Sequence, residues 1–407
     1  ATTSPFFVPG AMGGATGAAS ALLFITAVAL AGPLLVLRGA TWLVNRRIMP
    51  ARAAAVLATA NSRGYSKRVT AAVVPLALLM SLGSVQTGMG SIAADAAAQQ
   101  LGDAITADFV VQASPGAQGP LLDVLSGLPG VSGVAVSHVG LAHIDIDSTW
   151  EPASMRSVEI GESDALLDPR VSAGDLGALA ESGTVAVAAD SLMFTGKGLG
   201  DNLHVRYPNG TEADVTIVAI YELGLGVGGL IVSADTAALV AGTEAVPTVL
   251  VSADADRHAE VVAAAARTGV TLMTSEDYVD SVIHSSGGGN VVGDTLLLVL
   301  LAFIAIAAGN ALVIATRSRA KEFEMLARLG ATTRQLRAML SIESTLVAAA
   351  AVGMGTLTAV PGLTAASLAM VRGFSVGLDA AVYAGLAAVV VAVASLGVVG
   401  ARLKTHT

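Results

Sequence analysis

The sequence predicts an α-helical membrane bundle of five transmembrane helices that carries a large extracytoplasmic α+β domain. Of the 407 residues, 54% are hydrophobic and 13% are charged, and the mean hydropathy is +0.71, well beyond the composition of soluble domains. Five uncharged runs are each long enough to cross about 30 Å of hydrocarbon as a helix. Between the second and third runs lies a polar segment of roughly 200 residues, which is enough to bury a core of its own.

The five runs lie within 16–37, 69–94, 295–315, 344–371 and 380–401. Pro33 predicts a kink near the inner end of the first, and the second is expected to continue outward through 95–101 as a stalk. Four parts follow in order: an external lead with the first helix and the start of a cytoplasmic loop (1–50), an interfacial helix with the second membrane helix (51–94), the extracytoplasmic domain with its stalks (95–290), and three membrane helices with a cytoplasmic helix at 317–337 (291–407).

Charge placement predicts the orientation of these parts. Seven Lys and Arg and no acid lie between the first two runs, six cations follow the third, and Arg402 and Lys404 follow the fifth. By the positive-inside rule these segments are cytoplasmic. Residues 91–291 instead hold 26 Asp and Glu against six Lys and Arg, so this segment is the exported domain. The cations around 51–60 fit an interfacial helix or a purely topogenic charge cluster equally well.

The exported domain alternates strand and helix signals, and the absence of Cys means that it is stable without disulfides. Strands are expected at 108–111, 131–146, 155–160, 184–189, 248–252 and 270–273, helices at 121–126, 175–181 and 255–267, and a hairpin of 204–207 with 213–221 around the turn 208–210. Residues 108–146 and 248–283 therefore predict paired α+β halves that enclose a β-rich insertion.

Residues 317–337 form a basic amphipathic segment between two uncharged runs, which predicts a position at the membrane surface. Gly330 can take the left-handed conformation that ends a helix. Thr332 and Gln335 have the spacing of a capping box, which starts a second helix that continues into the fourth run. Apolar contacts of the first helix come from Phe323, Met325, Leu326 and Leu329. A surface helix joined rigidly to a membrane helix is suited to passing on force.

The same residues carry a resemblance to a known family. KEFEML at 321–326, LGA at 329–331 and RQL at 334–336, followed by Glu343 and a run of small residues, resemble the C-terminal signature of the FtsX-like (MacB-type) ABC transporter permeases. Weaker motifs at 128–131, 183–187, 200–201, 208–211 and 218–221 occur in the order of that family's periplasmic core domain. The resemblance covers 51–404 and leaves the first run outside, which implies that the chain is the C-terminal half of a longer permease.

This resemblance implies that 317–337 is a coupling helix that docks on a cytoplasmic ATP-binding subunit. The residues expected to couple are Arg319, Glu322, Glu324, Leu326, Arg328, Leu329, Gly330, Ala331, Thr332 and Gln335. Glu343 either ties the coupling helix to the membrane helices through Arg317 or Arg319, or remains an interfacial carboxylate in contact with water. For Arg328 and Arg334, anionic lipid is the alternative partner.

No phosphate-binding loop is present, because Gly196-Lys197-Gly198 lacks the flanking Gly and Ser or Thr of that motif. The chain is therefore expected to be no enzyme and to hold no cofactor or metal, with ATP and Mg on a dimeric ATP-binding partner. Further expected partners are a second permease half, upstream on the same chain or separate, membrane lipid, and an extracytoplasmic protein or lipoprotein. Nucleic acid is not expected.

The predicted function is the permease subunit of an ABC transporter in a bacterial cell membrane. It would couple ATP hydrolysis to movement of the extracytoplasmic domain and to export or extraction of a lipid, lipoprotein, peptide or drug. The alternative is a mechanotransmission complex that regulates a cell-wall hydrolase or senses peptides without transport. A third class, a receptor with no ATPase, leaves the pattern at 317–343 unexplained.

Three other patterns have ordinary explanations. His138 and His143 lie near several acids, but their odd separation places them on opposite faces of a strand, which favours structural roles over a metal site. The glycines of 224–229 resemble a dinucleotide-binding loop superficially, and a flexible loop is expected there. The small residues of 353–362 favour tight helix packing over a substrate path.

Overall fold

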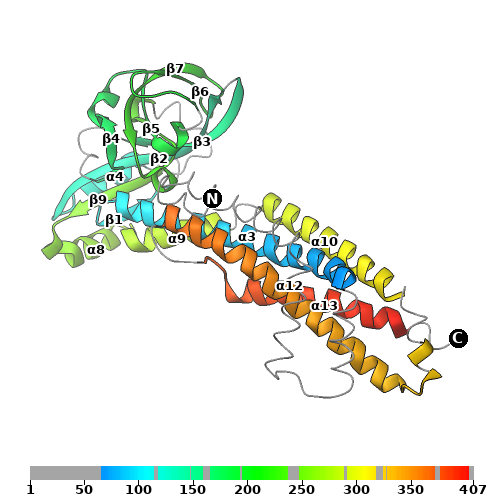
Figure 1. Cartoon of the computed structure of the whole chain (residues 1–407). Coiled ribbons are helices and arrows are strands. Elements are labelled where there is room, and N and C mark those ends of the chain that lie inside the picture. The colour runs from blue at the N-terminus through cyan, green and yellow to red at the C-terminus, as the bar shows by residue number, and fades with distance from the viewer. Residues whose placement is uncertain are drawn as a thin grey trace. The chain divides into compact units, whose positions relative to one another are not determined.

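The computed structural model describes residues 66–113, 118–146, 148–158, 166–192, 195–236, 247–287, 291–317, 324–326, 328–371 and 376–402 (Figure 1). The membrane helix expected at 16–37 and the cytoplasmic segment that follows it, up to residue 65, lie outside this range. The described residues form two compact units. The helical unit contains the described residues up to 92 and from 290 onward, and the β-rich unit contains those of 93–289.

Four long helices carry the apolar sequence of the described residues. These are α3 (Ser66–Ala104), α10 (Val291–Arg317), α12 (Thr333–Met370) and α13 (Ala380–Arg402). By length and composition, Val73–Ala104, Thr295–Ile314 and Thr333–Met370 could cross a membrane, and Ala380–Leu396 is a shorter apolar helix. Each of the last four expected spans is therefore helical, and α3 continues through 95–101 as predicted.

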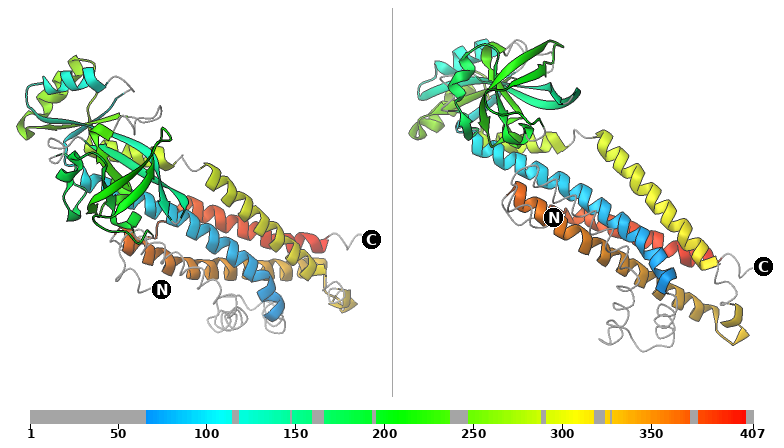
Figure 2. Two further views of the ribbon diagram at one scale, coloured as in Figure 1. Left: turned by 90° about the horizontal axis from the view of Figure 1, so that it is seen from above. Right: turned by 45° about the horizontal axis from the view of Figure 1, so that its top comes forward.

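The helical unit is held together by close contacts at small residues. Its core contains Leu76 and Met80 of α3, with Val347 and Ala351 of α12 and Val390 of α13. Figure 2 shows the four helices running along one another, and α13 contacts both α10 and α12. Gly355 of α12 lets that helix approach Ala77 and Met80 of α3, and the larger apolar side chains fill the remaining space.

The β-rich unit contains the strands and the shorter helices. In chain order its elements are β1 Phe109–Gln112, α4 Gln118–Ser126, β2 Val131–Ile146, β3 Thr149–Val158, β4 Val171–Gly174, the 3-10 helix η3 Leu176–Ala180, β5 Thr184–Ala188, α5 Ala189–Leu192, β6 Asn202–Arg206, β7 Glu212–Tyr221, α6 Gly224–Val227, β8 Leu230–Ser233, η4 Ala234–Thr236, β9 Pro247–Ala253, η5 Ala255–Arg257, α8 His258–Arg267, β10 Met273–Thr274 and α9 Ser275–Gly287.

Part of the sheet closes into a barrel. The strands pair in the order β2, β3, β8, β5, β7, β6, and β6 pairs back to β2 through His143 with Arg206 and Ile144 with Val205. Inward-facing apolar side chains fill the interior, among them Leu203 and Leu230. The interior is therefore a packed core, and closure leaves few unpaired strand edges.

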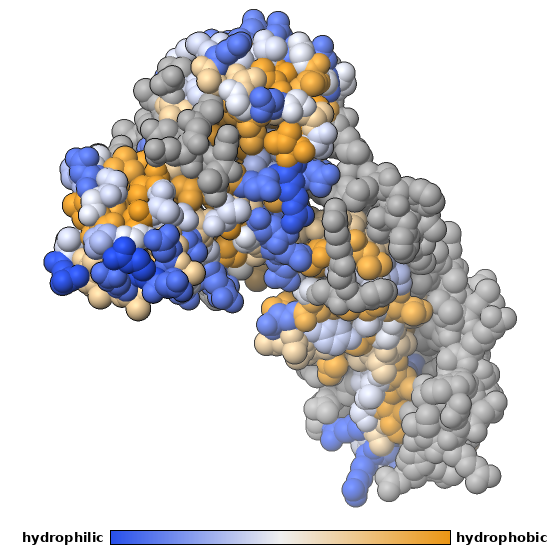
Figure 3. All heavy atoms as spheres, turned by 90° about the vertical axis from the view of Figure 1, so that its left-hand side faces the viewer, coloured by the Kyte–Doolittle hydropathy of each residue, from blue (hydrophilic) through white to orange (hydrophobic). Residues whose placement is uncertain are grey.

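A second lobe grows from the other half of the long strand β2. There the order is β10, β1, β9, β2, all antiparallel, and residues of α4 and α8 contribute to its core (Figure 1). This lobe joins residues 108–146 to residues 248–283, so the predicted pairing of two α+β halves around a β-rich insertion is confirmed. On the face shown in Figure 3, the β-rich unit presents hydrophilic residues interspersed with apolar ones.

Several described elements differ from the sequence prediction. Strand β3 begins at Thr149, six residues earlier than expected, because its exposed polar half pairs with β2 in a hairpin. Strand β10 has only two residues, since Val270 and Leu272 pack on the core of the second lobe. The helix expected at 175–181 is the 3-10 helix η3, and the Asp175 side chain accepts a hydrogen bond from the Gly177 amide at its start.

Candidate coupling segment

The described part of the coupling segment consists of a helical turn, a reversal and a second helix. Gly330 has a φ of 97°, as expected for the residue that ends the first helix. The Leu329 amide donates to the Met325 carbonyl and the Ala331 amide donates to the Leu326 carbonyl, each at 3.0 Å. These bonds use carbonyls that a helix end would otherwise leave unpaired.

Helix α12 begins with the predicted capping box. The Gln335 amide donates to Thr332 Oγ1, and the Thr332 amide donates to Gln335 Oε1. From this start α12 runs without interruption to Met370, and its side chains become buried at Met339 and then at Val347 and Ala348. The capped end is therefore part of the same helix that packs in the core of the helical unit.

The reversal leaves large apolar side chains exposed on the surface of the protein. Leu329 is 84% exposed and Met325 is 60% exposed, although both belong to residue types that are usually buried. Leu326 is half-buried and Ala331 is half-buried. These two exposed apolar side chains make the turn a candidate contact surface.

Charged groups surround these apolar side chains. Arg328 Nη2 donates to Glu324 Oε1 at 2.7 Å, an i,i+4 pair with both side chains largely exposed. Such a pair stabilises a helical turn by only a few tenths of a kcal/mol. Arg334 and Arg337 are exposed on the first turns of α12. The segment therefore combines exposed apolar side chains with exposed Arg side chains.

The expected coupling residues are not all described. Arg319 and Glu322 lie outside the described residues, whereas Glu324, Leu326, Arg328, Leu329, Gly330, Ala331, Thr332 and Gln335 all lie within eleven residues of one another around the reversal. Glu343 is half-buried on α12, two turns after the capping box. Met325 was expected only to supply apolar contacts; its exposure adds it to the candidate surface.

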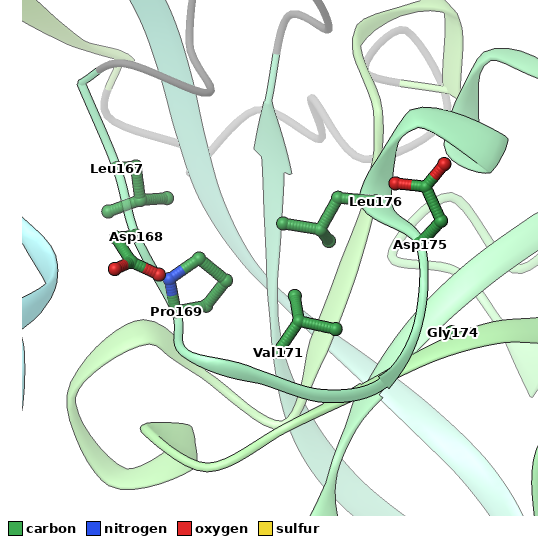
Figure 4. Close-up of a pocket in the computed structure, with 7 residues that line it drawn as sticks. All are labelled: Leu167, Asp168, Pro169, Val171, Gly174, Asp175 and Leu176. Atoms are coloured by element: carbon green, nitrogen blue, oxygen red, sulfur yellow. The ribbon is translucent and has the colours of Figure 1, made fainter.

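The β-rich unit contains a small pocket of about 230 Å³. It is lined by Leu167, Asp168, Pro169, Val171, Gly174, Asp175 and Leu176, and Figure 4 shows its two carboxylates at opposite sides. Asp168 accepts a hydrogen bond from the Arg170 amide at 2.8 Å, and Asp175 accepts one from the Gly177 amide at 3.0 Å. Both carboxylates thus stabilise local turns, and the pocket has the character of a surface depression.

The two histidines of β2 have separate surroundings. His138 lies against Ser157, with 3.3 Å from Nδ1 to Oγ, and burial lowers the pKa of its ring. His143 pairs across the sheet with Pro152. Among the residues that the structure describes, no group of three or more His, Cys, Asp or Glu is arranged to hold a metal ion.

The expectation of a flexible loop at the glycines of 224–229 is wrong. The segment contains the helical turn α6, and Val227 is buried. A Cβ at Gly226 would lie 2.3 Å from the Leu101 amide nitrogen, so glycine here permits contact with α3. A run of glycines in a sequence is compatible with flexibility and with close packing alike, and only the fold distinguishes them.

Known proteins were compared with the chain by family, by sequence and by structure. Residues 295–407 match the family model of the FtsX-like permease C-terminal domain, a match that covers most of α10 together with the coupling segment, α12 and α13. Curated proteins give no match to the chain. Among solved structures, the extracellular domain of the noncanonic ABC-type transporter YknZ from Gram-positive bacteria is similar with a TM-score of 0.31 and 13% identity, over 41% of this chain and 99% of that one.

Proposed function

We propose that the chain is the membrane subunit of an ABC transporter that works with a cytoplasmic ATP-binding subunit, because residues 295–407 match the family model of the FtsX-like permease C-terminal domain. Permeases of this family are membrane subunits of transporters and not enzymes. The matched domain and the three long apolar helices fit a protein of the cell membrane. ATP and Mg would be bound and hydrolysed by the partner subunit.

The observation that carries the proposal is the exposed Leu329 at the reversal before α12. An 84% exposed leucine on an ordered turn would gain about 2 kcal/mol on burial in a partner's apolar groove. The capping box and the uninterrupted α12 connect this contact point to the core of the helical unit. A force applied at Leu329 would therefore be transmitted to a membrane helix, because no flexible loop separates the two.

The distribution of charged residues supports the assignment of each segment to one side of the membrane. Six cations between the third and fourth apolar runs favour a cytoplasmic coupling segment, and the excess of 26 acids over six cations in 91–291 favours an exported β-rich unit. The apolar runs contain few charges, so a lipid-like or externally captured cargo fits better than a small ion. Lipid, lipoprotein, peptide and drug are the cargo classes that remain, and a second permease half would complete the path.

The test is co-expression of the full-length permease with the ATP-binding protein encoded beside it, followed by reconstitution in lipid nanodiscs. We expect a stable complex whose ATPase rate depends on the permease. Leu329→Asp should uncouple it, because a charge would enter the docking contact, while Leu329→Met should retain coupling. Leu199→Asp is the matched control, since Leu199 is also an exposed leucine but belongs to the β-rich unit.

Two results would overturn the proposal. Failure of any ATPase to co-purify would remove the basis for a coupling segment, and equal loss of coupling in Leu329→Asp and Leu199→Asp would show a general folding defect. Once a complex is in hand, ATP-driven movement of lipid or drug between vesicles would indicate transport. Cross-linking of a cell-wall hydrolase to the β-rich unit, without such movement, would indicate mechanotransmission.

A further inference from the structure

The Gly224–Gly229 segment, here called the glycine turn, contacts the outer end of α3 within the β-rich unit. The Leu225 amide donates to Gln100 Oε1 at 3.0 Å. A Cβ at Gly226 would lie 2.3 Å from the Leu101 nitrogen and 2.6 Å from the Gln100 carbonyl carbon. Any side chain at position 226 would therefore force the turn away from the helix.

Apolar packing surrounds this contact. Leu101 and Ala104 of α3 share a buried cluster with Leu223 and Val227, which flank the glycines, and with Tyr221 at the end of β7. These side chains are between 0% and 5% exposed. Burial on this scale holds the turn against the helix together with the hydrogen bond to Gln100.

The far side of the glycine turn is bonded to the barrel. The Gly229 amide donates to the Ser154 carbonyl on β3 at 2.8 Å, and the Ala188 amide of β5 donates to the Gly229 carbonyl at 2.9 Å. The Tyr221 hydroxyl of β7 donates to the Gly228 carbonyl at 2.5 Å. Three barrel strands thus reach one short turn.

A buried arginine completes the attachment. Arg156 on β3 is 4% exposed, its Nε donates to the Val227 carbonyl at 2.9 Å, and its Nη1 donates to Ser137 Oγ on β2 at 3.1 Å. Burial lowers the pKa of this guanidinium. Burying an arginine among apolar side chains is costly unless its donors are satisfied. Its bond to the Val227 carbonyl therefore fixes the position of that carbonyl.

From these contacts we propose that the glycine turn is a rigid joint that fixes the outer end of α3 to the β-barrel, so that the two move as one body. The joint has an α3 side, made by Gln100 and the bare backbone of Gly226, and a barrel side, made by Arg156, Ser154 and Tyr221. Its use in passing motion from the membrane to the barrel rests on the proposed function, whereas the rigidity of the joint does not.

Hydrogen exchange of the full chain in nanodiscs, without any ATP-binding subunit, tests the joint. In the wild type we expect the Leu225 amide and the backbone of 95–104 to be protected to a similar degree. Gln100→Ala should raise exchange in both segments together by roughly five- to tenfold, the loss expected for one partly buried hydrogen bond. Gln100→Glu should restore protection, because it keeps an oxygen acceptor for the Leu225 amide.

Matched controls are available on the same helix. Gln99 is exposed, so Gln99→Ala should leave exchange unchanged. Gly226→Ala should raise exchange at the turn and at 95–104 more than Gln100→Ala does. Gly102→Ala is its control, because a Cβ there would approach only Val279, at 4.0 Å.

Two results would contradict the proposal that the glycine turn is a rigid joint. Wild-type exchange at 224–229 as fast as in an exposed loop would show that the turn is mobile. A rise in exchange at Leu225 alone, with 95–104 still protected in both Gln100→Ala and Gly226→Ala, would show that the turn does not hold the helix. Neither result depends on an ATPase, so the joint and the proposed function can fail separately.

Discussion

Thr332 and Gln335 cap each other at the start of α12: the Gln335 amide donates to Thr332 Oγ1 at 3.3 Å, and the Thr332 amide donates to Gln335 Oε1 at 2.9 Å. Two backbone donors that would otherwise be unpaired are thereby satisfied. The reciprocal pair fixes the residue at which the membrane-core helix begins, directly after the exposed Leu329.

Thr332→Ala removes the hydroxyl acceptor and should cost about 1 kcal/mol at the helix start. We expect amide exchange at 333–336 to rise about fivefold and the coupling of ATPase rate to the permease to weaken, while the fold stays intact. Thr332→Ser, which keeps the hydroxyl, should behave as wild type. Equal exchange in the Ala and Ser variants would show that the box does not hold this helix end.

Two glycines one half-turn apart on α12 should respond in opposite ways to alanine. A Cβ at Gly355 would lie 2.7 Å from Met80 Cβ and 3.0 Å from the Ala77 carbonyl of α3, whereas a Cβ at Gly353 would meet nothing within 4 Å. Gly355→Ala must separate the helices or strain them, at a cost of about 1–3 kcal/mol. Gly353→Ala should be neutral or slightly stabilising, since alanine favours helix.

Thermal unfolding of the purified chain in detergent measures this difference. We expect a lower midpoint for Gly355→Ala and an unchanged or higher midpoint for Gly353→Ala. A similar fall in both variants would mean that α3 and α12 do not meet at Gly355.

The features that the sequence alone predicts are those made by near neighbours. The capping box at Thr332 and Gln335, the left-handed Gly330 and the strand Val131–Ile146 each depend on residues a few positions apart, and the structure confirms all three. The membrane helices are predictable for the same reason, because the backbone hydrogen bonds of a helix are all made within its own segment.

Features made by distant residues were not predictable in the same way. The barrel closes where His143 meets Arg206, 63 positions along the chain, and no local pattern marks that pairing. The glycine turn is tight because Gly226 meets Leu101, and its glycines alone are equally typical of a loop. The exposure of Leu329 likewise depends on where the reversal points, since an amphipathic pattern specifies an apolar face and not what covers it.

Arg156 should be among the most sensitive positions of the β-rich unit. Arg156→Met would leave the Val227 carbonyl and the Ser137 hydroxyl buried and unpaired, which we expect to cost about 2–4 kcal/mol. Arg206→Met is the control, because that guanidinium is exposed over the Trp150 ring and its ion pair with the exposed Glu212 is screened by solvent and contributes little to stability. Hydrogen exchange of the barrel strands provides the measurement, and comparable exchange in the two variants would contradict the role assigned to Arg156.

His204 makes the stability of the barrel depend on pH. Its Nδ1 lies 2.8 Å from Asp214 Oδ1 and its Nε2 lies 3.5 Å from Glu212 Oε2, and the hydrogen bond to Asp214 is the main reason that the pKa of His204 is raised. The pKa of Glu212 is lowered, chiefly by its bond to Arg206. Because the folded state favours the protonated ring, His204 stabilises the fold fully below the ordinary histidine pKa of about 6.5, and this contribution is lost as pH rises through the raised value.

The measurement compares the wild type with His204→Gln across that range. The midpoint of thermal unfolding should be higher for the wild type at acidic pH, and the difference should disappear above the raised pKa. In histidine NMR, the His204 signal can be identified by its loss in His204→Gln. This signal should titrate at a higher pH than that of a free histidine. Asp214→Asn should return the pKa of His204 toward its ordinary value. A wild-type advantage that grows with pH would reverse the sign of the coupling, and the pairing with Asp214 would then have to be abandoned.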